Sequence, residues 1–138
     1  MISVLVANSN EFYRAGIGAI ITATPGMKMA GEVRDSTGAV RWCRDNHADV
    51  ALLDIGFPVM SGLEAAKKIT RYTSETKVII LTDEHSLISP YKVMNSGAAG
   101  YLYQSSDRED LLHAIRISPS RPFLTPACML MTAIRWIN

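Results

Sequence analysis

The stretch DVALLDIGFPVMSGLEAAKKI, residues 49–69, decides the fold because it joins a buried strand to an amphipathic helix. The strand expected over 49–53 is almost wholly apolar, which is typical of the interior of a parallel sheet. Asp54 follows it directly, and Ser61 is a suitable N-cap for a helix over 62–72. The residues of this helix that we expect to face inward are Leu63, Ala66 and Ile69. A strand followed by a helix in this way forms one βα unit.

The same unit recurs on both sides of this stretch. Further strands, rich in aliphatic, β-branched or aromatic residues, are predicted at 2–6, 28–33, 77–81 and 99–103. Amphipathic helices are predicted at 10–23, 36–47, 88–96 and 107–117. Five βα units in alternation indicate an α/β fold, a doubly wound five-stranded parallel sheet with helices on both faces. The expected strand order is 2-1-3-4-5, the flavodoxin-like arrangement, in a single domain.

Local signals mark the ends and the inner faces of these helices. Asn10 is the expected N-cap of the first helix, Ser36 and Asp107 open the second and the fifth, and Gly97 ends the fourth. The residues expected to face inward are Phe12, Ala15, Ile17, Ala19 and Ile20 in the first helix, Val40 and Cys43 in the second, and Leu111, Leu112 and Ile115 in the fifth.

Composition excludes several classes of protein. The chain has 138 residues, 48% of them hydrophobic and 20% charged, which are ordinary values for one globular domain. The net charge of +1 does not favour nucleic acid or an anionic membrane as a partner, and no apolar run approaches the ~20 residues that span a bilayer. The amino end lacks a signal-peptide leader, and Cys43 and Cys128 lack paired-thiol spacing. We therefore expect reduced thiols in a cytoplasmic protein.

Two strand ends meet at the predicted ligand site. In this topology the site lies beyond the carboxyl ends of the first and third strands. The first strand runs into Asn8, Ser9 and Asn10, which are small, polar and uncharged, whereas the third strand ends in Asp54. The predicted pocket therefore combines one carboxylate with neutral side chains. The histidines, at 47, 85 and 113, lack the spacing of metal ligands.

Several segments resemble the receiver domains of bacterial response regulators. LLDIGFPVMSGLEAAKKI (52–69) resembles the phosphoacceptor segment, IILTD (79–83) the fourth strand, and MNSGAAGYLYQ (94–104) the entry to the fifth. The resemblance covers residues 1–118, and EFYRAGIGAII and GAAGYL are most similar to the NarL/LuxR type. It implies a CheY-like fold and a bacterial signalling protein, not an enzyme, that serves a two-component phosphorelay in transcription regulation.

The family uses five positions in its phosphorylation pocket, and this sequence keeps two of them. By the resemblance, Asp54 is the candidate phosphoacceptor, and Thr82 is the hydroxyl that contacts the phosphoryl group. The acidic pair that helps to hold Mg²⁺ falls on Asn8 and Ser9, and the lysine that neutralises the phosphoryl group falls on Gln104. Three of the five positions therefore depart from the pattern.

These departures predict a weak metal site. Mg²⁺ prefers carboxylate ligands, and one unit-charge contact at ~4 Å with an effective dielectric constant of ~20 is of order 4 kcal/mol. The vestigial site would comprise Asn8, Ser9, Asp54 and Gly56. We expect no functional metal there, weak or absent Mg²⁺ binding and no other cofactor. Metal-assisted phosphorylation should be impaired.

The two acids and their counter-cation are lost together. Three carboxylates and one lysine sum to −2, whereas Asp54 alone gives −1. Asn8, Ser9 and Gln104 can hydrogen-bond Asp54 and one another. The resemblance implies that Tyr101 is the aromatic residue that rotates inward when the switch hydroxyl moves. We therefore expect a locked or differently triggered switch.

Two alternatives remain open at this stage. One is a residual phosphorylation switch at Asp54. The other is a flavodoxin-like phosphate or flavin binder, in which Asn8, Ser9 and Asn10 cradle a phosphate at the amino end of the first helix. That loop has no glycine, and no pair of loop aromatics is evident to enclose a flavin.

Residues 119–138 are interpreted as a proline-rich linker and a short apolar helix, with no helix-turn-helix output domain in this chain. The apolar residues of the tail include Leu130, Met131, Ile134, Trp136 and Ile137. Together with Leu111, Leu112 and Ile115 of the fifth helix they predict a dimer, formed with a second copy or another response regulator. A histidine kinase is a further candidate partner, and we expect no membrane contact and no direct nucleic-acid contact by this segment.

Overall fold

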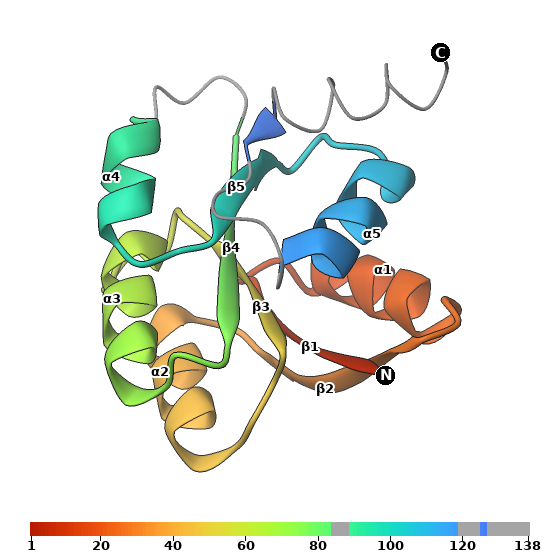
Figure 1. Ribbon diagram of the computed structural model, residues 1–138, viewed down its shortest axis with the longest axis horizontal. Coiled ribbons are helices and arrows are strands. Elements are labelled where there is room, and N and C mark those ends of the chain that lie inside the picture. Colours follow the sequence, from red (N-terminus) through yellow and green to blue (C-terminus); the bar gives the residue numbers. More distant parts are fainter. Residues whose placement is uncertain (84–88, 119–124, 127–138) are drawn as a thin grey trace.

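The computed structural model describes residues 1–83, 89–118 and 125–126 of the chain. Strands and helices alternate along it (Figure 1). The strands are β1 (Ile2–Ala7), β2 (Met27–Val33), β3 (Val50–Asp54), β4 (Lys77–Thr82) and β5 (Gly100–Tyr103). The helices are α1 (Glu11–Thr22), α2 (Ser36–Asp45), α3 (Gly62–Tyr72), α4 (Pro90–Asn95) and α5 (Arg108–Ile117). All ten elements predicted from the sequence are present, with ends that differ by at most two residues.

The strands form one parallel sheet in the order β2-β1-β3-β4-β5, which confirms the predicted topology. Helices α1 and α5 cover one face, and α2, α3 and α4 cover the other (Figure 1). The register places Asp54 of β3 beside Leu81 of β4, and Thr82 of β4 beside Tyr103 of β5. The ends of β3, β4 and β5 therefore lie next to one another at one edge of the sheet.

Each face of the sheet has its own hydrophobic core. On the α1 and α5 side, Val4, Val6, Leu52 and Ile79 pack with residues of both helices. On the other side, Leu5, Leu53, Ile80 and their neighbours pack against α2, α3 and α4. Alternate residues of β1 and β3 enter opposite cores, which explains why these strands are apolar on both faces.

Side-chain caps fix the starts of the helices. The side-chain oxygens of Asn10, Ser61 and Asp107 accept hydrogen bonds from backbone N–H groups in the first turns of α1, α3 and α5, as predicted. Helix α2 is capped by Asp35 instead of Ser36. Gly97, with φ of +86°, follows α4 in the left-handed conformation that favours glycine.

The predicted inner face of the first helix was wrong. Phe12 is 89% exposed, and Ala15 and Ala19 are also exposed. Among the predicted residues Ile17 is buried and Ile20 half-buried, and the fully inward stripe is Arg14, Ile17 and Ile21. Arg14 occupies this stripe because its guanidinium donates to the backbone oxygen of Asn8 and pairs with Glu32.

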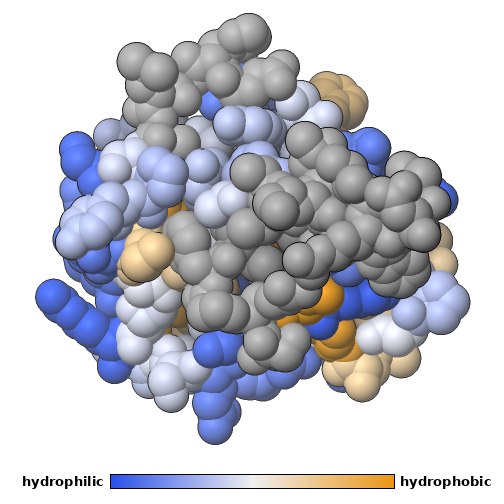
Figure 2. Space-filling model, turned by 45° about the horizontal axis from the view of Figure 1, so that its top comes forward, coloured by the Kyte–Doolittle hydropathy of each residue, from blue (hydrophilic) through white to orange (hydrophobic). Residues whose placement is uncertain are grey.

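The fifth helix contributes to the core and not to a free apolar surface. Leu111, Leu112 and Ile115 are 8%, 5% and 0% exposed, which corrects their predicted part in a dimer surface. The described area of the face in Figure 2 is mainly hydrophilic, with small separate hydrophobic areas. The predicted linker and terminal helix fall largely outside the described residues. Among the described helices, none combines the length and the apolar character needed to cross a bilayer.

Candidate functional site

The Asp54 carboxylate lies at the carboxyl end of β3 and is half-buried. Its Oδ1 accepts a hydrogen bond of 3.1 Å from the backbone N–H of Gly56 and another of 3.1 Å from Nε2 of Gln104. The start of α3 passes so close that a Cβ on Gly62 would collide with the backbone oxygen of Asp54 and lie 2.9 Å from Cα of Ile55. Only glycine fits this crossing without a backbone shift.

Gln104 brings β5 into the site. Its backbone N–H donates to the Thr82 oxygen at 2.8 Å, which fixes the residue just beyond the sheet edge. The side-chain amide then reaches Asp54, 50 residues away in sequence. This is the direct hydrogen bond expected between Gln104 and the carboxylate. An amide donates a hydrogen bond but adds no positive charge.

Asn8 and Ser9 lie at the end of β1 but differ in their environment. Asn8 is 3% exposed, and its Oδ1 accepts a 2.8 Å hydrogen bond from the backbone N–H of Asn10. Ser9 is exposed. The Asn8 side chain therefore serves the β1–α1 turn, and its oxygen already has a donor.

Tyr13 belongs to the site, although sequence reasoning missed it. Its hydroxyl donates to the backbone oxygen of Gln104 at 3.4 Å, so that α1 contacts the end of β5. Burial raises the pKa of Tyr13, and the negative charge of Asp54 raises it further. The available signal was its place in the first turn of the helix that starts at the pocket.

Thr82 and Tyr101 are both in the interior. Thr82 is fully buried at the end of β4, and its hydroxyl oxygen lies 3.5 Å from the backbone oxygen of Asp83. Tyr101 is 7% exposed and packs edge-on against Tyr103, with ring centres 6.4 Å apart. The structure thus brings Asp54, Gln104 and Tyr13 into one network, and places Thr82 on the adjoining strand.

The donor set does not suit a magnesium ion. The Oδ1 atom of Asp54 already accepts two hydrogen bonds. The remaining side chains at the expected positions, Asn8 and Ser9, are neutral. The described residues contain no cluster of three or more His, Cys, Asp or Glu side chains able to hold a metal. Mg²⁺ sheds its water reluctantly and favours carboxylate ligands, so these residues do not fit it.

Comparison with known proteins gives consistent matches. Residues 4–116 match the family described as the response regulator receiver domain. Over 116 residues the chain is 43% identical to the response regulator UvrY of Escherichia coli, a match that covers 84% of this chain and 53% of UvrY.

Solved structures agree with these matches. The signal receiver domain of the putative response regulator NarL from Mycobacterium tuberculosis superposes with a TM-score of 0.80 at 26% identity, covering 87% of this chain and 98% of that one. A LuxR-family response regulator from Aurantimonas shares the fold, with a TM-score of 0.84 at 24% identity, and 100% and 99% of the two chains are covered.

The chain spans about half the length of the curated relatives that it matches. Its matched segment includes β1 from Val4 onward, all of β2 to β5 and of α1 to α4, and α5 up to Arg116. This chain belongs to the family of response regulator receiver domains, the signalling modules of two-component systems.

Proposed function

We propose that this receiver domain signals without Mg²⁺-assisted phosphorylation of Asp54. The observation that carries the proposal is the hydrogen bond from Gln104 Nε2 to Asp54 Oδ1 at 3.1 Å. A neutral amide occupies the position from which the family's lysine would neutralise an incoming phosphoryl group. The acids that would recruit a metal are replaced by Asn8, whose oxygen is already engaged, and by Ser9.

The chemistry of phosphoryl transfer supports this proposal. Catalysis of that reaction consists almost entirely of positioning and charge neutralisation. Each missing charge removes an interaction of order 4 kcal/mol at ~4 Å and an effective dielectric constant of ~20, before desolvation is counted. A tenfold change in affinity corresponds to ~1.4 kcal/mol. The interaction energy lost with two acids and one lysine therefore far exceeds what hydrogen bonds from neutral groups restore.

The proposed output is a protein contact. Response regulators interact with histidine kinases and form dimers, and the named relatives are response regulators. We propose that this chain acts in transcription regulation by pairing with itself, with another response regulator, or with an output domain. It would therefore contribute a regulated surface, not an enzymatic step.

The direct test is a titration with MgCl₂ while the backbone amide of Gly56 and the side-chain amide of Gln104 are followed by NMR. We expect no saturable shift in the low millimolar range. We also expect acetyl phosphate and beryllofluoride to leave the Asp54 region unchanged. Saturation below a few millimolar Mg²⁺, or a stable phosphoryl adduct at Asp54 by mass spectrometry, would overturn the proposal.

Restoring the charges should restore the chemistry. The triple variant Asn8→Asp, Ser9→Asp and Gln104→Lys should bind Mg²⁺ because the Asp54 carboxylate and the scaffold remain. Its stability without metal should fall, since carboxylates then crowd one corner. The matched control adds Asp54→Asn to the same triple variant and should lose the binding. A folded triple variant that ignores Mg²⁺ would contradict the residue assignments.

A residual phosphorylation switch is the second candidate. It is favoured by the half-buried carboxylate of Asp54 and by Thr82 on the adjoining strand. Under this alternative, acetyl phosphate would phosphorylate the wild type slowly, and Asp54→Asn would remove the adduct. The same mass measurement therefore separates the two candidates.

A further inference from the structure

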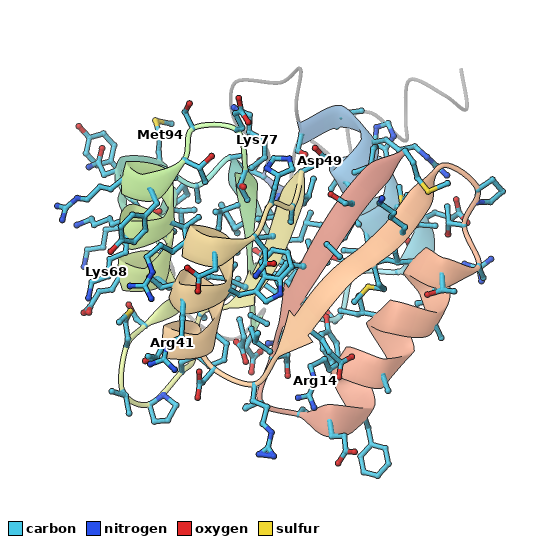
Figure 3. All side chains as sticks on the ribbon, turned by 90° about the horizontal axis from the view of Figure 1, so that it is seen from below. Arg14, Arg41, Asp49, Lys68, Lys77 and Met94 are labelled. Atoms are coloured by element: carbon cyan, nitrogen blue, oxygen red, sulfur yellow. The ribbon has the colours of Figure 1, made fainter. Side chains whose placement is uncertain are left out.

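A polar groove between α3 and α4 lies away from the pocket. It has a volume of about 300 Å³ and is lined by Lys67, Thr70, Arg71, Asn95, Ser96 and Gly97. Both helices run antiparallel to the strands, so their carboxyl ends lie where the strands begin. Figure 3 places Met94 of α4 at the same end as Asp49 and Lys77, and Arg14, which contacts Asn8, at the opposite end.

The α3 wall of this groove carries two cations. Lys67 and Arg71 lie one helical turn apart on the same face of α3, and both are exposed. Among the described residues, neither takes part in an ion pair, whereas Arg14, Arg44 and Arg108 each have an acidic neighbour. The wall therefore presents positive charge that the described part of the domain does not neutralise.

The α4 wall adds an aromatic ring and an amide. Asn95 lines the groove, and Tyr91 lies one turn earlier on the same helical face. Tyr91 is 71% exposed, which is high for an aromatic side chain. The Asn95 amide can both donate to and accept from a peptide backbone. This wall can therefore contact an apolar side chain and a main chain at once.

The floor of the groove is tightly packed, and its hydroxyl groups already donate their hydrogen bonds to backbone oxygens. The Thr70 hydroxyl donates to the Ala66 oxygen at 2.9 Å, and the Ser96 hydroxyl donates to the Val93 oxygen. A Cβ on Gly97 would lie 2.7 Å from Thr70 Oγ1, so the floor is tightly packed. The carboxyl ends of α3 and α4 also direct carbonyl oxygens here, which disfavours a concentrated anion such as phosphate against the backbone.

We propose that this groove docks an extended acidic segment of a partner protein. Residues four apart in a helix rise about 6 Å along its axis, and alternate residues of an extended chain are about 6.5 Å apart. Two acidic side chains at alternate positions thus match Lys67 and Arg71, while the side chain between them faces Tyr91. The side chains of the two helices would recognise the segment, and the residues at the bottom of the groove would limit how deeply it binds. The site is independent of the Asp54 chemistry.

The test uses the full chain and a fluorescein-labelled peptide with glutamate at alternate positions around a central tyrosine. Its glutamine analogue, pyrophosphate and a short DNA duplex serve as comparison probes. In NMR titrations at low salt, the glutamate peptide should shift the amides of Asn95, Ser96 and Gly97. Lys67→Glu with Arg71→Glu should weaken binding about tenfold or more, because two attractive charge pairs become repulsive. Added salt should weaken it as well.

The matched control is Arg108→Glu with Arg116→Glu. These exposed arginines lie on α5, across the sheet, and the change in net charge is the same. Binding equal to the wild type in this control supports the groove, and equal loss in both double variants overturns it. Equal binding of the glutamine peptide, or stronger shifts with pyrophosphate or DNA, also overturns the peptide assignment. If the reversed variant misfolds, Lys67→Gln with Arg71→Gln replaces it.

Discussion

Tyr13, Gln104 and Asp54 form a chain of contacts that joins three elements through single side chains. The Tyr13 hydroxyl meets the Gln104 backbone, and the Gln104 amide meets the carboxylate. The two hydrogen bonds use neutral donors, so the charge of Asp54 is contacted but not cancelled. Its field therefore extends to Tyr13, whose pKa it raises in addition to the effect of burial.

Asp54→Asn should lower the pKa of Tyr13. The value should remain above the usual 10.0, because burial is the larger cause of the shift. A raised pKa in the folded state stabilises the protein below pH 10.0, and this contribution is lost as the pH rises through the folded value. Titration of ¹³Cζ-labelled tyrosine, with Tyr13→Phe for assignment, measures the change. An unaltered titration in Asp54→Asn would show that the two groups do not interact.

Cys43 should react slowly with alkylating reagents. Burial raises its pKa from 9.0 to about 11, which lowers the thiolate fraction at pH 8 about a hundredfold. Iodoacetamide labelling followed by mass spectrometry should show slow modification at this position in the native protein and rapid modification in urea. Equal rates in both conditions would contradict its burial.

At the scale of elements, the sequence predicted every strand and helix but misplaced one helix face. Apolar periodicity identifies a helix, yet it cannot show that the guanidinium of Arg14 is satisfied inside by Asn8 and Glu32. Phe12 was therefore placed inward by its hydrophobicity alone. The predicted topology correctly placed the carboxyl ends of β1 and β3 side by side, where Ala7 pairs with Leu53. It gave no sign of Tyr13, because that contact depends on the angle at which α1 leaves the turn.

Two glycines should respond in opposite ways to alanine. Gly62→Ala should destabilise the protein by about 2 kcal/mol or more, because the new methyl group meets the backbone of Asp54 and Ile55. Gly16→Ala, on an exposed position of α1 with no atom within 4 Å of the new Cβ, should stabilise it by about 0.5–1 kcal/mol. Urea unfolding of both variants provides the comparison. A neutral Gly62→Ala would mean that the β3–α3 crossing is looser than described.

At the scale of the whole molecule, the two cores use most of the apolar side chains. The large ones left exposed in the described residues are Met1, Phe12, Val59, Tyr72, Tyr91 and Met94, distributed over five different segments. Leu111, Leu112 and Ile115 are unavailable to a partner. Any strong self-association should therefore depend on the apolar tail.

The full chain should form a dimer at micromolar concentration without phosphorylation, and the chain that lacks residues 127–138 should be a monomer. The reason is compositional, since the tail places Leu130, Met131, Ile134, Trp136 and Ile137 within eight residues. Light scattering on the two proteins measures this. A monomeric full chain would refute the dimer, and a dimeric truncation would move the interface to the described surface.

The central position of β1 has a consequence for synthesis on the ribosome. Of the five strands it is synthesised first, yet it pairs with β2 on one side and with β3 on the other, and Ser3 bonds to Asp49. At about 5–20 residues per second, synthesis from Ile2 to Asp54 takes about 3–10 seconds. Throughout that interval ISVLVA is an apolar strand with an open edge, the kind of segment that aggregates. The nascent chain is therefore most vulnerable before its third strand is made, and slower translation of the codons for residues 2–54 should lower the yield of soluble protein.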